Sequence, residues 1–350
     1  MTAPAIGHRA QLDCLRFLAF LGVFIFHFDE RAYAYGCLGV QLFFVLSGFL
    51  ITRLLLQNET RNLRRDLGIF YVRRTLRIFP LYYLVLVVLL LAGRLPHAWW
   101  HFSYLHNVLM FLQPHLTPGV TGHFWSLSVE EQFYLLYPLL LLLTPARFRL
   151  LLLLALLVGS SASRMILHRL YPETRYWALL PVQGEYLVWG CFAGLFDITQ
   201  RTRPIPVGKC LLAGLLLHAL AAVDQFGLLG RPNAFGLYQT MHGIGFALIV
   251  LSLWRLPEGW LMRLLTLAPL VYLGKISYGL YVFHNFCYGV DVWLVEALPW
   301  LGVVPGPILV FAVVVGMAIL SWHLFEGPIN RLKDFVPYRK VEGTHDSSPA

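Results

Sequence analysis

Residues 303–325 are VVPGPILVFAVVVGMAILSWHLF, a stretch in which nearly every side chain is apolar. About 20 mostly apolar residues in a helix are enough to cross the roughly 30 Å hydrocarbon layer of a membrane. A helix suits this environment because it satisfies its backbone hydrogen bonds within the segment. The stretch therefore predicts a transmembrane helix.

Similar stretches recur along the whole chain of 350 residues, which is 58% hydrophobic and 13% charged. A soluble domain is nearer half apolar and a quarter charged. The sequence therefore predicts an all-α, polytopic transmembrane bundle of about ten helices. The sixth segment is only fourteen residues long, and we expect it to be broken or tilted. The ten predicted segments are residues 12–28, 38–56, 79–93, 126–144, 148–165, 184–197, 207–223, 237–254, 271–294 and 303–325.

The lysines and arginines predict the orientation, because cytoplasmic loops of membrane proteins carry the positive excess. With the N-terminus inside and alternating segments, 21 of the 27 basic residues lie on the cytoplasmic side and six outside. The longest loops are then 57–78 inside and 94–125 outside. This bias predicts cytoplasmic N- and C-termini and a multi-pass protein of the cell (inner) membrane. It also explains the net charge of +9 without a nucleic-acid partner. We expect a transmembrane domain over residues 8–331 and a polar, disordered tail over 332–350.

Ionisable groups within membrane segments are costly unless they face a bundle interior or a water-filled cavity, so they indicate where function lies. In the first segment, Arg16 and His27 are eleven residues apart. That spacing returns them to nearly the same helix face, separated by roughly 16 Å along the axis. Asp13, one turn before Arg16, can pair with it. The pattern fits a functional site, and it also fits an interfacial ion pair beside an isolated histidine.

The fourth segment carries a polar stripe on one face, formed by Ser126, Glu130, Tyr134 and Tyr137. Their spacing of four, four and three residues keeps them aligned on a helix. Glu131 points about 100° away. We expect Glu130 to serve a site and Glu131 to interact with the helix dipole at the N-terminal first turn.

A second polar seam lies in the ninth segment, where Ser277, Tyr281 and His284 share a face and Tyr278 lies one turn before Tyr281. Hydrogen bonds that only hold helices together account for such a seam as well as chemistry does.

Three arginines, Arg73, Arg74 and Arg77, stand at helix-like spacing just before the third segment. The guanidinium group binds phosphate with two parallel hydrogen bonds, so these residues could hold a nucleotide-bearing co-substrate. Topology signalling and anionic lipid binding are the alternatives. We expect no metal site, since the histidines of residues 96–123 match no zinc spacing and the five cysteines are scattered.

Six motifs in order resemble the membrane acyltransferase family 3 over residues 8–331. They are LDCLRFLAFLGVFIFH, GVQLFFVLSGFLIT, RRTLRIFP, HFWSLSVEEQFYLLYP, GKISYGLYVFHN and SWHLFEGPINR. The resemblance implies a ten-helix enzyme that moves an acyl group, often acetyl, from cytoplasmic acyl-CoA to a hydroxyl of a carbohydrate or similar acceptor. It places Arg16 and His27 at the family's essential motif, Glu130 at its conserved acid, and Arg74 and Arg77 at its cytoplasmic RxxR. Some members carry an additional hydrolase-like domain, and we expect any such partner to be another polypeptide.

These residues suggest a mechanism in which the arginines hold the CoA phosphates and the pantetheine arm reaches along the first segment. His27 would act as general base on the acceptor hydroxyl, because its ordinary pKa near 6.5 suits neutral pH. Glu130 would orient the imidazole or balance its charge. Direct transfer and a covalent acyl-histidine intermediate both remain open. The leading alternative is a proton-coupled transporter using His27, Glu130 and His284 as a relay.

Overall fold

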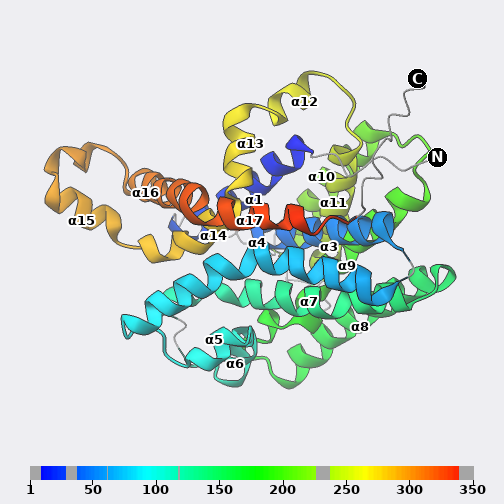
Figure 1. Ribbon diagram of the computed structural model, residues 1–350, viewed down its shortest axis with the longest axis horizontal. Coiled ribbons are helices and arrows are strands. Elements are labelled where there is room, and N and C mark those ends of the chain that lie inside the picture. Colours follow the sequence, from blue (N-terminus) through cyan, green and yellow to red (C-terminus); the bar gives the residue numbers. More distant parts are fainter. Residues whose placement is uncertain (1–8, 29–37, 61, 117–118, 226–236, 339–350) are drawn as a thin grey trace, which may run out of the picture.

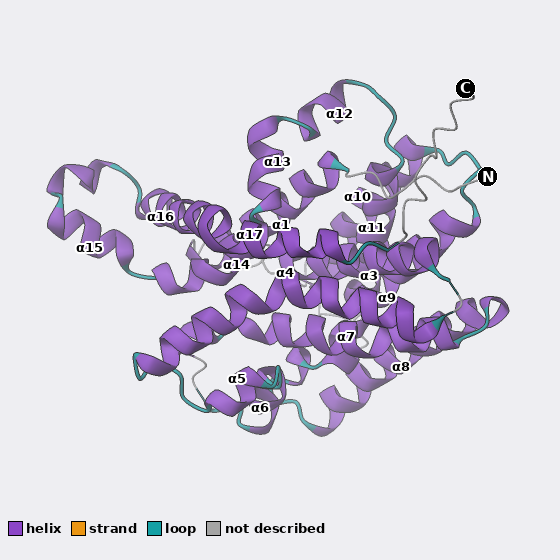
Figure 2. Ribbon diagram, in the orientation of Figure 1, coloured by secondary structure: helices purple, strands orange, loops and turns teal. Residues whose placement is uncertain are grey.

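The computed structural model describes residues 9–28, 38–60, 62–116, 119–225 and 237–338. Within these residues it contains helices joined by loops and turns, and no strand (Figure 2). This confirms the predicted all-α fold.

Each of the ten predicted segments coincides with at least one helix. Among the described residues, six regions are long and apolar enough to cross a membrane: α1, α3, α4, α8 with the turn before it, α11, and α16 with the short helices after it. The count of ten and the orientation of the termini stay predictions. The long helices are α1 (Ala10–Phe28), α3 (Leu38–Asn58), α4 (Leu63–Leu91), α7 (Phe124–Leu143), α8 (Arg149–Leu170), α9 (Leu180–Thr199), α10 (Val207–Gln225), α11 (Leu237–Trp254) and α16 (Gly306–Ser321).

The helix that carries the three arginines begins much earlier than the predicted third segment, 79–93. Asn62 caps it by accepting a hydrogen bond from the Arg65 backbone N–H at 3.1 Å, and the helix continues past Pro80 to Leu91. Most of the predicted loop 57–78 is therefore helical. Hydropathy marked only the apolar half of α4, because its first half is rich in charged side chains.

The sixth and ninth segments also differ from expectation. α9 is one unbroken helix of 20 residues, so a break is ruled out and a tilt stays a prediction. The ninth segment divides into α13 (Ala268–Lys275), α14 (Ser277–Phe283) and η5 (His284–Cys287), with a non-helical residue at Ile276. Just before this break, a Cβ at Gly274 would lie 1.8 Å from the Asp13 carbonyl oxygen. The glycine therefore lets α13 cross α1 in close backbone contact.

Close crossings also define the centre of the bundle, where α3 packs on α9. A Cβ at Gly48 would lie 1.9 Å from the Leu187 carbonyl oxygen, and one at Gly190 would lie 2.0 Å from the Val45 carbonyl oxygen. Small residues at such crossings let helix backbones approach and pack without bulky side chains between them.

Two buried carboxylates of α9 form ion pairs with neighbouring elements. Asp197 of α9 pairs with Arg53 of α3 and, at 2.5 Å, with Arg255. Glu185 of α9 pairs with Arg164 of α8. Several ionisable side chains that hydrocarbon would exclude are therefore neutralised inside the protein.

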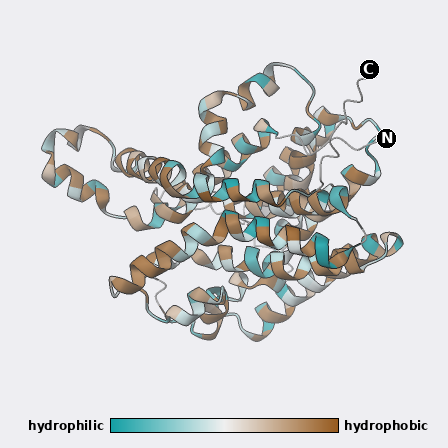
Figure 3. Cartoon of the chain, viewed as in Figure 1, coloured by the Kyte–Doolittle hydropathy of each residue, from teal (hydrophilic) through white to brown (hydrophobic). Residues whose placement is uncertain are grey.

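Large apolar side chains face outward, as expected for contact with lipid. Leu91 of α4, Val158 of α8 and Leu320 of α16 are all more than half exposed. Figure 3 shows hydrophobic residues along α16 and the C-terminal half of α4. Together with α15 (Val290–Ala297), α16 extends away from the rest of the bundle (Figure 1).

The shorter helices join the bundle at its ends. After α16 the chain forms a π-helical turn, η7 (Trp322–Glu326), then α17 (Gly327–Arg331) and the 3₁₀ turn η8 (Leu332–Phe335). Of the predicted tail 332–350, residues up to 338 are described, and the expected disorder of 339–350 lies outside the described residues. The remaining short helices are α5 (Ala98–Phe102), α6 (His106–Leu112) and α12 (Trp260–Leu265).

Candidate active site

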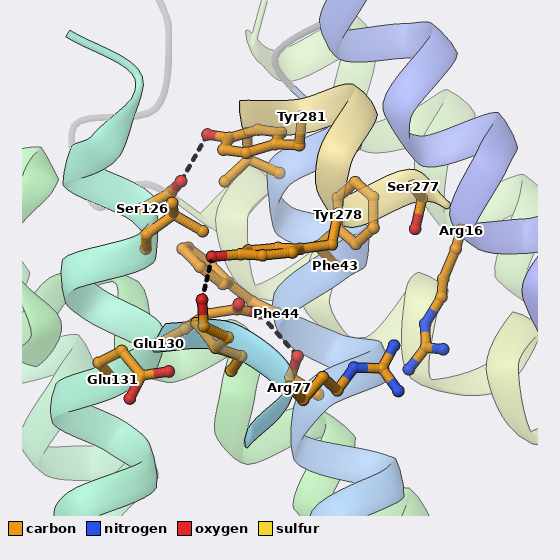
Figure 4. A pocket seen from close by; sticks show the side chains of 14 residues that line it. Arg16, Phe43, Phe44, Arg77, Ser126, Glu130, Glu131, Ser277, Tyr278 and Tyr281 are labelled. Carbon is orange, nitrogen blue, oxygen red and sulfur yellow. Dashed lines mark hydrogen bonds between the residues drawn. The ribbon is translucent and has the colours of Figure 1, made fainter. Parts of the chain in front are cut away.

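Helices α1, α3, α4, α7 and α14 surround a polar pocket of about 80 Å³, here called the central pocket (Figure 4). The break after α13 turns the start of α14 toward it. Seven residues singled out from the sequence line this pocket: Arg16, Arg77, Ser126, Glu130, Ser277, Tyr278 and Tyr281. The fold therefore gathers residues that are up to 265 positions apart in the chain.

Glu130 is held by α3 through a hydrogen bond that the sequence did not indicate. The Ser47 hydroxyl donates to Glu130 Oε1 at 2.6 Å, and the Tyr134 hydroxyl donates to Ser47 Oγ at 3.0 Å. Farther along the same face, Tyr137 and Thr52 share a 2.7 Å hydrogen bond. Three members of the predicted stripe of α7, Glu130, Tyr134 and Tyr137, therefore form polar contacts with α3.

The dipole interpretation of Glu131 is wrong. α7 starts at Phe124, so Glu131 lies beyond its first turn, which contains no acidic residue. Instead, Glu131 lines the central pocket beside Glu130 (Figure 4). The pocket is wide enough to reach around more than 100° of the α7 surface, so neighbouring residues on the helix both face it.

A short hydrogen bond joins α7 to α14 above the carboxylates. Ser126 Oγ and the Tyr281 hydroxyl lie 2.5 Å apart (Figure 4), and the Tyr281 hydroxyl also donates to the His123 carbonyl oxygen at 2.9 Å. Tyr278 donates to the Ile78 carbonyl oxygen of α4 at 2.8 Å. The seam predicted on the ninth segment is therefore built into the contacts between three helices.

Three histidines from different elements cluster next to Tyr281, and we call them the histidine cluster. The ring centroids of His27 and His284 are 4.9 Å apart, and those of His123 and His284 are 4.8 Å apart. The Tyr281 ring lies 5.3 Å from that of His284. His27 is partly exposed, whereas His123 and His284 are buried.

The backbone decides the tautomer of each ring. His27 Nδ1 is 2.9 Å from the Val23 carbonyl oxygen, His284 Nδ1 is 2.6 Å from that of Tyr281, and His123 Nε2 is 3.1 Å from that of Val282. A carbonyl only accepts, so each of these nitrogens must donate its N–H. In the neutral rings, the other nitrogen of each histidine therefore keeps a lone pair that can accept a proton.

No hydrogen bond joins Glu130 to His27 among the described residues, so Glu130 does not orient the imidazole by direct contact, and its role in balancing the charge stays a prediction. His123, whose ring lies in the histidine cluster, precedes Glu130 by seven residues, roughly 10 Å along α7. The Nδ1 bond to Val23 fixes the His27 ring instead.

The three arginines of α4 have different surroundings, although Arg73 and Arg77, four residues apart, lie on nearly the same helix face. Arg77 lines the central pocket with Arg16 (Figure 4). The guanidinium of Arg74 lies 4.9 Å from the Tyr134 ring centroid. Arg73 donates to two carbonyl oxygens near the C-terminus, those of Lys333 and Val336. Only Arg77 of the three lines a described cavity.

A larger open cavity of about 710 Å³, which we call the basic cavity, adjoins the central pocket. The two share Arg16, Arg77 and Tyr278 in their walls. Arg16 also pairs with Asp13 at 3.4 Å, as predicted. Along the bundle, polar groups thus follow one another from the basic cavity through the central pocket to the histidine cluster.

Sequence reasoning missed five residues of this path: Ser47, His123, Lys275, Glu326 and Lys333. Two signals were present in the sequence. His123 precedes Ser126 by three residues and so shares its face. A second set of residues has the spacing of the α7 stripe, four, four and three residues. It consists of Trp322, Glu326, Asn330 and Lys333, and all four line the basic cavity.

No group of three or more His, Cys, Asp or Glu side chains in the described ranges is placed to hold a metal ion. The groups at hand are bases, hydroxyls, carboxylates and cations, which suit proton transfer and anion binding.

Comparison with known proteins gives the family. A family model described as an acyltransferase domain matches residues 9–326. The chain belongs to the membrane acyltransferase family 3. The resemblance of the six motifs is thereby confirmed. No solved structure matches the fold closely enough to be compared.

Several curated proteins are similar to this acyltransferase-family chain. The O-acetyltransferase OatA of Staphylococcus aureus is 29% identical over 91% of this chain and 57% of its own length. Bacillus subtilis YrhL is 30% identical over 91% of this chain and 54% of its own. The peptidoglycan O-acetyltransferase OatA of Listeria monocytogenes is 28% identical over 78% and 48%. The chain thus spans about half the length of these relatives.

Proposed function

We propose that this protein is a multi-pass O-acyltransferase of the cell membrane that moves an acetyl group from acetyl-CoA to a hydroxyl of a carbohydrate acceptor. The observation that carries the proposal is the continuous polar path from the basic cavity to the histidine cluster, with Arg16, Arg77 and Tyr278 at the junction. The names of the relatives, O-acetyltransferase and peptidoglycan O-acetyltransferase, support the reaction and a cell-wall glycan as acceptor.

The positive charge of the basic cavity sets the proposed direction of acyl transfer. Phosphates of the donor would enter at the basic cavity on the cytoplasmic side, and the acceptor would meet the histidine cluster at the opposite end. Arg16 and His27 lie on one helix, roughly 16 Å apart along its axis, which is of the same order as the length of a pantetheine arm. The thioester would thus reach His27 while the phosphates stay outside the hydrocarbon.

In the transfer step, His27 Nε2 would take the proton of the acceptor hydroxyl. The hydroxyl oxygen would attack the thioester carbonyl and form the ester bond, while the carbon–sulfur bond breaks and CoA leaves as a thiolate. The thiolate would take the proton from His27 Nε2, which returns the imidazole to its neutral form. The Nδ1–H bond to Val23 leaves Nε2 as the available base. Glu130, held by Ser47, would balance the positive charge of Arg16 and Arg77 in the central pocket.

The test is acetyl-CoA consumption by purified protein in proteoliposomes, with and without soluble peptidoglycan fragments. We expect acceptor-dependent release of CoA. His27→Ala should lower the rate by roughly 10²–10⁴-fold, as loss of a general base does. His97→Ala, which changes an exposed histidine, is the matched control and should keep the wild-type rate. More than a tenth of the rate in His27→Ala would contradict the assigned base, and acceptor movement without acyl turnover would indicate a transporter.

A further inference from the structure

The basic cavity carries more positive than negative side chains. Its cations are Arg16, Arg77, Lys275 and Lys333, and its anions are Asp13 and Glu326. Asp13 already pairs with Arg16, and Ser321 donates to Glu326 Oε1 at 2.7 Å. Arg77, Lys275 and Lys333 form no ion pair within the described residues, so the cavity keeps an excess of positive charge to which both lysines contribute.

Lys275 and Lys333 stand on separate elements at the edge of this cavity. Lys275 is the last residue of α13, and its ammonium lies 5.1 Å from the Trp322 ring centroid. Lys333 belongs to η8. Neither forms an ion pair within the part of the chain that the structure describes. Both can therefore offer ammonium protons to an anionic ligand.

Arg73 holds the segment that carries Lys333. Its Nη1 donates to the Lys333 carbonyl oxygen at 2.6 Å and to the Val336 carbonyl oxygen at 2.9 Å, and its guanidinium lies 4.7 Å from the Tyr338 ring centroid. These contacts join α4 to η8 across 260 residues of sequence. The arginine expected to bind phosphate is thus engaged with the backbone of the cavity wall.

We infer that Lys275 and Lys333 bind the phosphate groups of the donor nucleotide, and that Arg73 acts as a positioning residue for Lys333. The inference rests on the proposed function, which supplies acetyl-CoA as donor. Lysine binds phosphate as a compact positive charge and needs no fixed fork geometry. Arg16 and Arg77, at the junction with the central pocket, then lie nearer the acyl end. Asn330 lines the same cavity, and its buried Oδ1 has no partner among the described residues.

Binding of adenosine 3′,5′-bisphosphate tests the lysines without requiring acyl transfer. Wild type, Lys275→Gln and Lys333→Gln would be titrated calorimetrically in nanodiscs of zwitterionic lipid. Each variant should bind roughly tenfold more weakly, as expected for one lost charge-assisted hydrogen bond. Lys209→Gln removes an exposed lysine that lines neither cavity and changes the net charge equally. It should bind as wild type does.

The donor's nucleotide offers a kinetic control. With acetyl-CoA, both lysine variants should show a KM raised roughly tenfold with little change in kcat, because the contact is equally present in ground and transition states. With S-acetylpantetheine, which lacks the nucleotide, wild type and variants should behave alike. A rise in KM for both donors would show a general disturbance of the cavity and overturn the inference.

A double-mutant cycle tests the role of Arg73. If Arg73 acts through Lys333, Arg73→Ala should raise the acetyl-CoA KM, and adding Lys333→Gln should raise it little further. Independent phosphate binding by Arg73 would make the two effects multiply, which would contradict the positioning role.

The failures of the two proposals are distinguishable. Tight binding of the bisphosphate and normal acetyl transfer in both lysine variants would reject the lysine site and leave the proposed function standing. A wild-type protein that binds neither the bisphosphate nor acetyl-CoA would overturn the proposed donor and the lysine site with it.

Discussion

Two adjacent carboxylates in the central pocket have different surroundings. Glu130 accepts a 2.6 Å hydrogen bond from Ser47, whereas the buried Oε1 of Glu131 has no partner in the described chain. We expect Glu130→Gln to lower turnover by roughly 10²-fold, since it removes a fixed negative charge from a site whose electrostatics are preorganised. Glu131→Gln should lower it less than tenfold. The measurement is initial acetyl-transfer rate at saturating donor, normalised to inserted protein.

Equal losses in the two variants, or a larger loss in Glu131→Gln, would show that the unpartnered carboxylate is the functional one. A Ser47→Ala variant provides a check, because it removes the hydrogen bond and keeps the Glu130 charge. Its rate should lie between those of wild type and Glu130→Gln.

Residue spacing predicted which side chains share a helix face and could not predict which faces meet. The spacing predicts the stripe that contains Ser126 and Glu130, because both residues lie on one helix. The spacing does not identify Ser47 and His123 as site residues, because their importance arises from contacts between helices. The spacing of Arg73, Arg74 and Arg77 predicts one shared face, because residues three and four apart on a helix lie within about 60° of each other. Their separate roles arise from the neighbouring elements, since Arg73 donates to the backbone of residues 333 and 336 whereas Arg77 lines the central pocket.

At the scale of the helices, the close crossing of α3 and α9 makes a stability prediction. A Cβ at Gly190 would meet backbone at 2.0 Å, so Gly190→Ala must push the two helices apart. We expect a loss of about 1–3 kcal/mol or more, typical of overpacking, seen as a lower melting temperature in detergent. Gly159→Ala, where nothing lies within 4 Å, should leave it unchanged or slightly higher. Equal melting temperatures would contradict the tight crossing.

The short helices α5 and α6 meet through two buried, stacked histidines whose ring centroids are 4.1 Å apart. Burial, with the nearby His97, lowers the pKa of His101 to about 4. Burial, with His101 and Arg175, lowers the pKa of His106 to about 3. Below pH 6.5 the unfolded segment takes up protons that the folded segment excludes. The stability of the folded segment therefore has its full value above pH 6.5 and falls progressively as the pH is lowered toward 3–4.

We expect the free energy of opening of this segment to be lower at pH 5 than at pH 7, by up to about 2 kcal/mol for one histidine. Hydrogen exchange of residues 98–112, corrected for intrinsic rates, measures the change. His106→Phe keeps an aromatic stack and should reduce the pH response, whereas the exposed His115→Phe should not. An undiminished response in His106→Phe would assign the effect elsewhere.

Apolar length predicted where helices form and missed where they extend or break. The first half of α4 is helical but charged, so hydropathy placed the start of the segment at residue 79 instead of residue 63. The ninth segment is apolar enough on average to suggest one continuous span despite Lys275 and the polar seam, so hydropathy did not indicate the break at Ile276. Its cause is tertiary, since α13 and α1 approach closely at Gly274.

At the scale of the whole molecule, the positive-charge bias predicts which end of the bundle faces the cytoplasm. In a cysteine-free background, a single cysteine at Glu173 should react with a membrane-impermeant maleimide in intact cells. A cysteine at Arg203 should react only after permeabilisation. The opposite pattern would reverse the orientation and place the basic cavity outside, where acetyl-CoA cannot supply it. Labelling of both cysteines in intact cells would show that one predicted segment does not cross the membrane.

The π-helical turn η7 sets the register of everything after it. A π-turn holds one more residue than an α-turn, and such turns are frequent at functional sites. This turn ends at Glu326, and Asn330 and Lys333 follow it in the chain. All three side chains line the basic cavity. Removing Leu324 alone would let the turn relax to a regular helix and rotate these side chains together by about 100°. One residue of chain length, with no change in any polar group, therefore decides whether this wall presents its charges to the cavity or to lipid.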